Sequence, residues 1–409
     1  MTDIKIYNGN QIGGCITVIS SEKARIMIDF GENLPGAEAE KENFNWEEEK
    51  IDAVLFTHYH GDHIGRFKEI PDGIPLYMGD LTRQVMITIS KYVKDAEALR
   101  ILRGGTRVHT VTAAQSFEIK DIRVTPYMVD HSAFDAYMYL VETPDKTILH
   151  TGDFRGHGYR GKSVIPMINK YIRKFGKRDV DVLITEGTML SRMTEEVYSE
   201  AHMLQDCKKL FEQHKYVFLI CSSTNVDTLA TFYHSAKSHY MKMYANSYVC
   251  EQIEHYKEAA KGYTDLYDFR YVYEYNPDKV IHSYISDKPI TQEEIMREEG
   301  FVIVIKAEEK YKSWIDRFAD VEPIVVYSMW EGYLNQNNRA YNAEWKRFLD
   351  SCNHVEYMHT SGHAAAPLLA DVINAVEPRE CIYPIHTENA KELEELNIKD
   401  ELQRRICYG

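Results

Sequence analysis

The nine residues THYHGDHIG, at positions 57 to 65, constrain the fold of this chain more than any other stretch of its sequence. They follow IDAVLF (51–56), an apolar run rich in β-forming residues that predicts a buried strand. Three histidines and one aspartate therefore stand together at a strand end. The stretch has both the ligand types and the structural context that a metal site requires.

The spacing within this motif indicates two points of convergence. Alternate residues of an extended segment face the same side, so His58 and His60 can meet at one point. Gly61 lets the chain turn, and Asp62 and His63 begin a short helix that faces a second point nearby. The motif predicts two adjacent groups of nitrogen and oxygen ligands suited to zinc or a similar ion. A polar loop with solvated histidines is the alternative.

Length and composition indicate a soluble protein. The 409 residues are enough for two substantial cores, and 44% hydrophobic and 27% charged residues are typical of globular proteins. The N-terminus lacks the features of a signal peptide and no apolar run approaches membrane-spanning length, so we expect a cytoplasmic protein with no membrane partner. The seven cysteines form no C-x-x-C pair, which suits a reducing compartment and favours packing roles.

The net charge of −15 argues against a broad nucleic-acid-binding surface, because neutralising phosphates requires Lys and Arg. One stretch departs from this balance, since residues 154–178 contain eight basic residues and no acidic one. It predicts either a basic lip that admits a strand locally or an ordinary solvated helix face with a loop.

Three further residues at strand ends are candidate ligands. His131 lies at the apex of a bend between two predicted strands, Asp153 follows the apolar strand KTILH, and His386 follows the short strand CIYPI. A lone histidine is more often a hydrogen-bonded structural residue than a ligand. A site for two metals, however, needs more side chains than the first motif supplies, and these three in this order complete the set.

The combined pattern resembles the metallo-β-lactamase superfamily, which has an early Asp after a strand (here Asp29), then H-x-H-x-D-H, a later His, an Asp after a strand and a final His. The resemblance implies an α/β fold, a four-layer αββα sandwich with the site at one edge. Asp29 would support the ligand loop. The resemblance also implies two metals, with His58, His60 and His131 holding the first, Asp62, His63 and His386 holding the second, and Asp153 bridging them.

The segment between Asp153 and His386 resembles one branch of that superfamily, the nucleic-acid-processing β-CASP proteins. The strand in DVLITEGTML ends at Glu186, and MHTSGHAAAPLLADVINAVEP places His363 in a tight loop before a helix. These match the first two extra motifs of the branch, and His386 is the third. The run H-T-S-G-H-A, followed later by PIHTE, is closest to the ribonuclease J group, although Thr387 stands where that group has glycine.

The order of the motifs predicts three segments. Residues 1–192 would form the first part of the metallo-β-lactamase domain, residues 193–345 an inserted α/β β-CASP domain, and residues 346–409 the return to the first domain. The stretch IVVYSMWEGYL would hold the last strand of the insert. The chain stops soon after His386, without the C-terminal extension of many ribonuclease J proteins, and no oligomeric state is predicted.

Candidate substrate-binding residues lie in two loops. The strand YVFLI leads into a Ser-Ser-Thr-Asn turn and a helix, which would point N–H groups and hydroxyls at an anion, so Ser223 and Asn225 are candidates. Helix capping by Asn225 is the alternative. Ser361 and His363 are the candidates in the second loop. The tyrosines of segment 256–275 could stack on bases or fill the core.

The resemblance implies a zinc-dependent ribonuclease that cleaves phosphodiester bonds of single-stranded RNA, with DNA as an alternative, by exonucleolytic or endonucleolytic action. Two Zn²⁺ ions, or Mn²⁺, would hold a bridging hydroxide as nucleophile. Asp62 would hold the water, and His363 beside Glu186 would stabilise the phosphate or protonate the leaving group. A metallo-hydrolase of a small phosphoester, lactone or thioester is the second hypothesis, favoured by the acidic balance. A non-catalytic binding module is the third.

Overall fold

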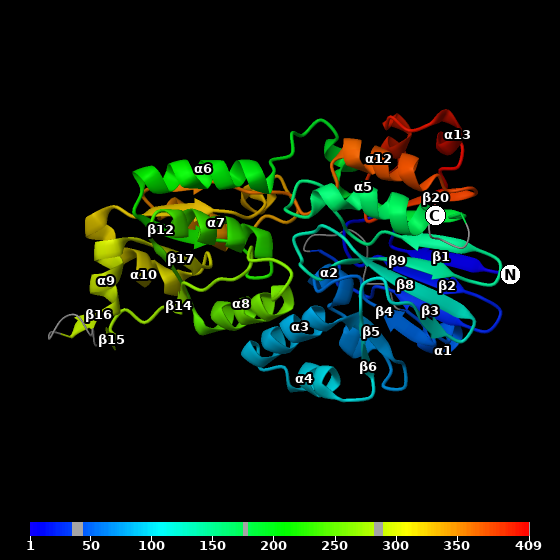
Figure 1. Cartoon of the computed structure of the whole chain (residues 1–409), viewed down its shortest axis with the longest axis horizontal. Coiled ribbons are helices and arrows are strands. Elements are labelled where there is room, and N and C mark those ends of the chain that lie inside the picture. The colour runs from blue at the N-terminus through cyan, green and yellow to red at the C-terminus, as the bar shows by residue number, and fades with distance from the viewer. Residues whose placement is uncertain (35–43, 175–178, 282–288, 409) are drawn as a thin grey trace. The chain divides into compact units, whose positions relative to one another are not determined.

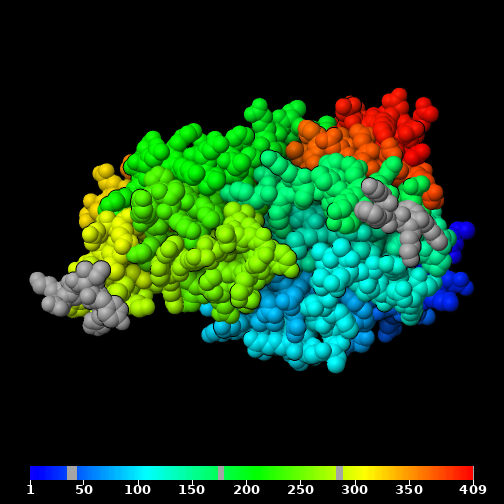
Figure 2. All heavy atoms as spheres, viewed as in Figure 1, coloured from blue at the N-terminus to red at the C-terminus, as the bar shows by residue number. Residues whose placement is uncertain are grey.

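The computed structural model describes residues 1–34, 44–174, 179–281 and 289–408, and it separates into two compact units. Unit 1 comprises Met1–Val197 and Gly362–Gly409, and unit 2 comprises Tyr198–Ser361. In the space-filling view, the orange and red residues after Gly362 form one surface with the cyan and green residues of the same unit (Figure 2). Unit 1 is therefore built from both ends of the chain.

Two six-stranded sheets form the centre of unit 1 (Figure 1). The first sheet is antiparallel from β1 to β3 and parallel from β3 to β6. Its strands, in spatial order, are β1 (Asp3–Tyr7), β2 (Ile16–Ser20), β3 (Arg25–Ile28), β4 (Ala53–Leu55), β5 (Leu76–Gly79) and β6 (Val108–Val111).

The second sheet is parallel among β20, β11 and β10 and antiparallel from β10 to β7. Its strands, in spatial order, are β20 (Cys381–Ile385), β11 (Val182–Glu186), β10 (Thr147–His150), β9 (Tyr137–Glu142), β8 (Ile122–Met128) and β7 (Phe117–Ile119). Because β20 comes from the end of the chain, the C-terminal segment completes this sheet.

The two sheets pack face to face around one apolar core. Ile26, Ile28 and Leu55 of the first sheet share a buried cluster with Tyr139 and Ile184 of the second. Helices α3 and α4 cover the first sheet, and α5 and α12 cover the second (Figure 1). This is the predicted αββα sandwich, and the α/β fold class is confirmed. The helices of unit 1 are α1 (Trp46–Glu49), α2 (Gly61–Ile64), α3 (Asp80–Tyr92), α4 (Ala96–Arg103), α5 (Val164–Met167), α12 (Ala366–Val376) and α13 (Asp400–Gln403).

A six-stranded sheet, parallel throughout, forms the centre of unit 2. Its inner strands read YVFLI, FVIVI and IVVY, the continuous β-branched and aromatic runs expected of strands that are covered on both faces. In spatial order the strands are β14 (Val272–Glu274), β13 (Lys242–Ala245), β17 (Phe301–Ile305), β12 (Tyr216–Ile220), β18 (Ile324–Tyr327) and β19 (Val355–Tyr357). A separate two-stranded sheet consists of β15 (Val280–Ile281) and β16 (Ile290–Thr291).

The helices of unit 2 are α6 (Glu200–Gln213), α7 (Val226–Ser238), α8 (Ser247–Ala260), α9 (Gln292–Glu299), α10 (Lys312–Asp316) and α11 (Ala343–Asp350). In neither unit do the described residues include a helix with the length and apolar character needed to cross a membrane.

The last strand of unit 2 differs from the prediction. The stretch IVVYSMWEGYL does form a strand, β18, but β19 pairs with it in parallel further along the chain. Unit 2 therefore extends to Ser361 rather than ending near residue 345. The edge strand β19 has only three residues, Val355–Tyr357, which is too short for an alternating pattern to show in the sequence.

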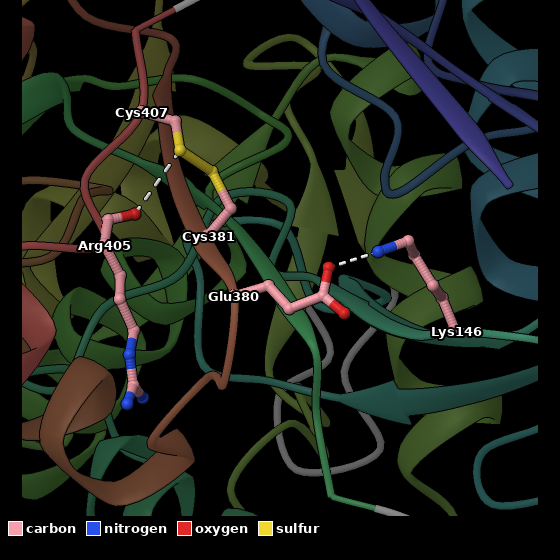
Figure 3. Close-up of a disulfide and its surroundings, with 5 residues drawn as sticks. All are labelled: Lys146, Glu380, Cys381, Arg405 and Cys407. Atoms are coloured by element: carbon pink, nitrogen blue, oxygen red, sulfur yellow. Dashed lines mark hydrogen bonds and ion pairs between the residues drawn. A yellow bond between two sulfur atoms is a disulfide. The ribbon is translucent and has the colours of Figure 1, made fainter.

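A disulfide between Cys381 and Cys407 joins the C-terminal segment to β20 (Figure 3). Backbone hydrogen bonds of 2.8 Å, from Cys407 N to Ile382 O and from Ile382 N to Arg405 O, hold the segment alongside the strand. The prediction that the cysteines are reduced packing residues is therefore wrong for this pair. The other five cysteines are free thiols, and Cys15, Cys207 and Cys221 among them are buried.

Candidate metal centre

The predicted ligands of unit 1 meet where several strands of the two sheets end. After β4 the chain continues through Thr57 to His60, which is the N-cap residue of α2. Asp62 and His63 lie in α2 itself. The other three ligands follow strands of the second sheet. His131 lies between β8 and β9, Asp153 follows β10, and His386 follows β20.

His58, His60 and His131 direct ring nitrogens at one another. Nε2 of His58 lies 3.0 Å, and Nε2 of His131 3.2 Å, from Nδ1 of His60. The opposite nitrogen of His131 donates to the carbonyl of Gly362 at 2.6 Å, and that of His58 lies 3.1 Å from Oγ1 of Thr57. A hydrogen bond at one ring nitrogen fixes the tautomer that leaves the other for a metal. The three rings thus have the arrangement of a three-imidazole site.

Asp62, His63, His386 and Asp153 form a second group beside the first. Nε2 of His63 lies 3.1 Å from Oδ2 of Asp153 and 3.7 Å from Oδ2 of Asp62. Nε2 of His386 lies 3.2 Å from Oδ2 of Asp62. Asp153 also groups with His58, so its carboxylate lies between the two sets. All seven predicted ligands are therefore brought together.

Burial and charge set the protonation of these groups. Burial, together with the neighbouring histidines, lowers the pKa of all three imidazoles of the first group, that of His60 to about 4. Burial would raise the pKa of Asp62 and Asp153, but the charges of His63 and His386 outweigh it, and both values are lowered. Neutral imidazoles and ionised carboxylates are the donors that a divalent ion requires, so the first group and the two carboxylates fit the predicted cofactor. The pKa of His63 is raised by the charges of Asp153, Asp62 and Asp29, so this imidazole has to release a proton when it binds an ion.

Asp29 orients the ligand loop from behind. Its carboxylate accepts hydrogen bonds from N and Oγ1 of Thr57, at 2.7 and 2.8 Å, and lies 2.8 Å from Nδ1 of His63. With Nδ1 held by Asp29, Nε2 of His63 faces Asp153. The supporting position that the resemblance implied for Asp29 is the position that it occupies.

Glu186 and His363 lie next to the second group. Nδ1 of His363 is 3.3 Å from Oε2 of Glu186 and 3.5 Å from Oδ2 of Asp153. Burial lowers the pKa of His363, but the charges of Glu186 and Asp153 outweigh it and raise the pKa to about 9. Glu186 is buried and belongs to none of the groups that could hold a metal ion, whereas His363 lies in one with Asp153 and His386.

Apart from Asp29, the groups that orient the metal ligands were not predicted from the sequence. Oγ1 of Thr188 lies 2.9 Å from Nδ1 of His386, and the Gly362 carbonyl holds His131. Thr57 is the first residue of THYHGDH and Thr188 is the last residue of TEGT, and this position within the motifs is the signal that could have indicated them. A backbone carbonyl carries no signal of its own in a single sequence.

Two family models match this chain. The first, described as a Beta-lactamase superfamily domain, matches residues 24–217. The second, described as a Zn-dependent metallo-hydrolase RNA specificity domain, matches residues 351–401. Between them they contain every residue of the two ligand groups. The chain therefore contains a Beta-lactamase superfamily domain.

Two known proteins are similar to this chain over part of its length. It is 28% identical over 193 residues to ribonuclease J of Helicobacter pylori, an alignment that covers 44% of this chain and 26% of that protein. It is 30% identical over 178 residues to the lactamase-like protein adaB of Aspergillus niger, covering 42% of this chain and 49% of that one. This chain therefore spans about a quarter and about half of the two relatives' lengths.

A solved structure shares the fold over nearly the whole chain. The crystal structure of a protein of unknown function from Enterococcus faecalis V583 covers 96% of this chain, and this chain covers 95% of it, with a TM-score of 0.68 and 18% identity. Together with the motifs, the family and sequence matches confirm the predicted resemblance to the β-CASP branch of the metallo-β-lactamase superfamily and to ribonuclease J.

The candidate phosphate-binding residues Ser223, Asn225 and Ser361 lie in unit 2. Asn225 is the N-cap of α7 and accepts a hydrogen bond from Thr228 N at 3.2 Å, which is the capping role that the sequence left open. Oγ of Ser223 donates to Oη of Tyr248 at 3.1 Å. Ser361 is the last residue of the unit. Substrate binding by the three stays a prediction.

The tyrosines of segment 256–275 divide into two sets. Tyr256, Tyr267 and Tyr275 are buried in unit 2, whereas Tyr263, Tyr271 and Tyr273 are exposed. Only the exposed set could stack on a base, since a buried ring offers no free face.

The basic stretch 154–178 also divides. Arg155 is fully buried, and Arg160 is half-buried against backbone carbonyls of unit 1. Lys162, Lys170 and Arg173 are exposed, and Arg173 forms an ion pair with Glu377. Residues 175–178, which carry the last two basic side chains, lie outside the described residues. The two arginines nearest the ligands therefore face the protein rather than forming a lip.

Proposed function

We propose that this metallo-β-lactamase protein is a metal-dependent ribonuclease that hydrolyses phosphodiester bonds of single-stranded RNA. One observation carries the proposal. The match to an RNA specificity domain, at residues 351–401, covers the segment that contributes His386 to the second ligand group and carries His363 next to that group. The part of the chain that resembles an RNA-processing domain is thus also part of the metal centre. The similarity to ribonuclease J of Helicobacter pylori gives further support.

Two zinc ions, with manganese as the alternative, are the proposed cofactors. His58, His60 and His131 would hold one ion, Asp62, His63 and His386 the other, and Asp153 would contact both. Bound here, the ions would activate water and offset negative charge on the phosphoryl oxygens. Histidine and carboxylate ligands accept either metal, so the choice depends on which metal is available.

The side chains around the ions have distinct roles in the proposed reaction. Asp62, whose pKa is lowered, would accept a hydrogen bond from the attacking water and orient it. His363 would donate a proton from Nε2 to the leaving oxygen, because its Nδ1 faces Glu186 and Asp153. Glu186 would keep Nδ1 of His363 protonated and so fix the ring. His363 and Glu186 thus form an acid and its orienting base.

The strand of RNA would be bound by polar and aromatic side chains. Ser361 and His363 stand two residues apart in one loop and would contact the scissile phosphate. Ser223 and Asn225, at the N-terminus of α7, would contact a neighbouring phosphate, since the first N–H groups of a helix attract anions. Contacts of this kind ignore base identity and need little positive charge, which suits a chain of net charge −15.

A cleavage assay tests the proposal. Purified protein would be loaded with Zn²⁺ or Mn²⁺ and incubated with labelled single-stranded RNA and DNA that carry a 5′ monophosphate, triphosphate or hydroxyl, and the products would be sized. We expect RNA cleavage that disappears with a chelator and in His60→Ala. A ladder that begins at one end would indicate exonucleolytic action, and internal products would indicate endonucleolytic action.

Two results would contradict the proposal. Intact RNA with metal-loaded protein would remove the ribonuclease, and hydrolysis of a small phosphodiester, lactone or thioester by the same sample would replace it with the second hypothesis. Equal RNA cleavage by wild type and His60→Ala would identify a contaminating nuclease.

A further inference from the structure

The basic stretch that follows Asp153 has its first two arginines turned toward the loop that carries His131. The loop comprises residues 130–134, between β8 and β9. Arg155 lies two residues after Asp153 and is the largest fully buried side chain described in the protein. A buried guanidinium requires a partner for its charge, and Asp130, which forms an ion pair with Arg155, belongs to the loop of a candidate metal ligand.

Asp130 and Arg155 connect the two ligand segments directly. Both side chains are fully buried, and Nε of Arg155 lies 3.7 Å from Oδ2 of Asp130. Arg155 N donates to the Asp130 carbonyl at 2.7 Å, and Gly158 N donates to Oδ2 of Asp130 at 2.9 Å. Because Asp130 precedes His131 and Arg155 follows Asp153 by two residues, these contacts fix one ligand segment against the other.

Arg160 holds the rest of the same loop. Its guanidinium donates to the carbonyls of His131 at 3.2 Å and Ala133 at 3.3 Å, and also to the carbonyl of Phe134. It also lies over the Phe134 ring, 4.7 Å from the centroid. One planar donor group thus binds three backbone carbonyls of one loop, including the carbonyl of a ligand residue.

We propose that Asp130, Arg155 and Arg160 form a clamp that positions the His131 and Asp153 segments for metal binding. This ligand clamp rests on the proposed function, because it presumes that these two residues hold metal. It gives the basic stretch a role other than nucleic-acid contact. Groups that orient ligands commonly change metal affinity 10- to 100-fold when they are removed, by order of magnitude, without being ligands themselves.

The ligand clamp can be tested by Zn²⁺ binding to the full-length, metal-stripped protein, measured by competition with a chromophoric chelator. The variants are Asp130→Asn, which keeps the size of the side chain, Arg155→Lys and Arg160→Ala. We expect each to bind at least one Zn²⁺ about 10- to 100-fold more weakly than wild type. The readout is metal affinity, so it does not depend on RNA cleavage.

Two matched controls separate positioning from general destabilisation. Arg107 also donates to loop carbonyls, those of Ile70, Pro71 and Ile74, but this loop carries no candidate ligand. Lys162 is an exposed residue of the same basic stretch. Arg107→Ala and Lys162→Ala should bind Zn²⁺ as wild type does, and thermal unfolding of each variant would be recorded beside its affinity.

The Zn²⁺ affinities distinguish a failure of the ligand clamp from a failure of the metal centre. If folded clamp variants bind Zn²⁺ like wild type, or if Arg107→Ala weakens binding as much as they do, the ligand clamp is overturned while the metal centre stands. If wild type itself binds no Zn²⁺, the proposed metal centre fails and the clamp with it. Should Arg155→Lys not fold, the half-buried Arg160 and the same-sized Asp130→Asn variant carry the test.

Discussion

Oε2 of Glu186 lies 3.3 Å from Nδ1 of His363, and the rest of the same carboxylate joins two loops of the metal centre. Oε1 accepts hydrogen bonds from the backbone N–H of Phe154 at 3.2 Å and of Ala364 at 3.1 Å. These residues directly follow Asp153 and His363. We therefore expect Glu186 to act through His363, as a positioning residue.

We predict that Glu186→Gln lowers kcat for RNA about 10- to 100-fold with little change in KM, since the amide keeps an acceptor but loses the charge that holds the imidazole. His363→Ala should cost about 100- to 10,000-fold. Because the two act as a unit, the double variant should be no slower than His363→Ala alone. Steady-state kinetics on one labelled RNA measures all three.

A buried acid at the other end of the same strand provides the control for that series. Asp181 stands just before β11, whereas Glu186 ends it, and Asp181 accepts from Thr147 N and Arg379. Asp181→Asn should lower stability but leave kcat of the folded enzyme unchanged. Additive losses in the double variant would mean that Glu186 and His363 act independently.

Metal removal should destabilise unit 1, because the ligands are buried around the ions only in the folded state. At a free Zn²⁺ concentration of about 100 times Kd, binding adds about 2.7 kcal/mol to the free energy of unfolding. Thermal unfolding with Zn²⁺ and with excess chelator measures this difference. We expect His60→Ala to lose most of this stabilisation by Zn²⁺. His109→Ala changes an exposed histidine of β6 and should keep the stabilisation. Equal midpoints with and without metal would contradict the centre.

The ligand set could be predicted because its signals are local. His58, His60, Asp62 and His63 share one short motif after a buried strand, and Asp153 and His386 each follow an apolar strand of their own. The spacing of the residues, the end of the strand and the types of ligand can all be read within a few neighbouring residues. The resemblance to a known family then supplied the αββα sandwich, which local patterns alone do not determine.

The supporting groups could not be predicted because their signals are distant or hidden. Gly362 holds His131 through a backbone carbonyl, across 231 residues of sequence. Arg155 and Arg160 are residues of a type that is usually exposed, and only the tertiary structure shows that Arg155 is buried and Arg160 half-buried. Cys381 and Cys407 form a disulfide although their spacing has no characteristic pattern. The sequence thus indicated the groups that would contact metal, together with Asp29 and Glu186 behind them, but not the other groups that hold the ligands.

The sequence indicated a role for Gly61 in turning the chain at α2, and Gly31 lies against the backbone of the same helix. A Cβ on Gly61 would meet nothing within 4 Å, whereas a Cβ on Gly31 would lie 1.8 Å from the Asp62 carbonyl oxygen and 2.3 Å from His63 N. Backbone atoms of a hydrogen-bonded helix cannot move aside as a side chain can. The glycine that lets the motif form is therefore Gly31, outside the motif.

We predict that Gly31→Ala destabilises the protein by about 1–3 kcal/mol or more and weakens Zn²⁺ binding, because α2 must shift. Gly61→Ala should change stability by less than about 1 kcal/mol, since alanine favours the helix. Urea unfolding and the chelator titration test the pair together. The same loss in both variants would mean that α2 tolerates no added methyl group, and no loss in either would contradict the close approach.

The buried His150 should make stability depend on pH. Its Nδ1 accepts a hydrogen bond from Gly152 N at 3.1 Å, its Nε2 lies 3.2 Å from Oγ1 of Thr17, and burial lowers its pKa to about 4. In the unfolded chain a histidine titrates near about 6.5. Below that pH the unfolded state binds a proton that the folded state excludes, so stability falls as the pH falls toward 4.

At about 1.4 kcal/mol per pH unit, this one group should cost about 2 kcal/mol of unfolding free energy between about pH 6.5 and about pH 5. His150→Gln cannot take up the proton and should lose that share of the acid dependence, while the exposed His109→Gln keeps it. Urea unfolding of the metal-stripped proteins at both pH values gives the comparison, because the buried ligand histidines contribute equally to all three. If the free energy of unfolding falls equally between the two pH values in wild type and in His150→Gln, His150 is charged in the folded protein and its hydrogen bond from Gly152 does not form.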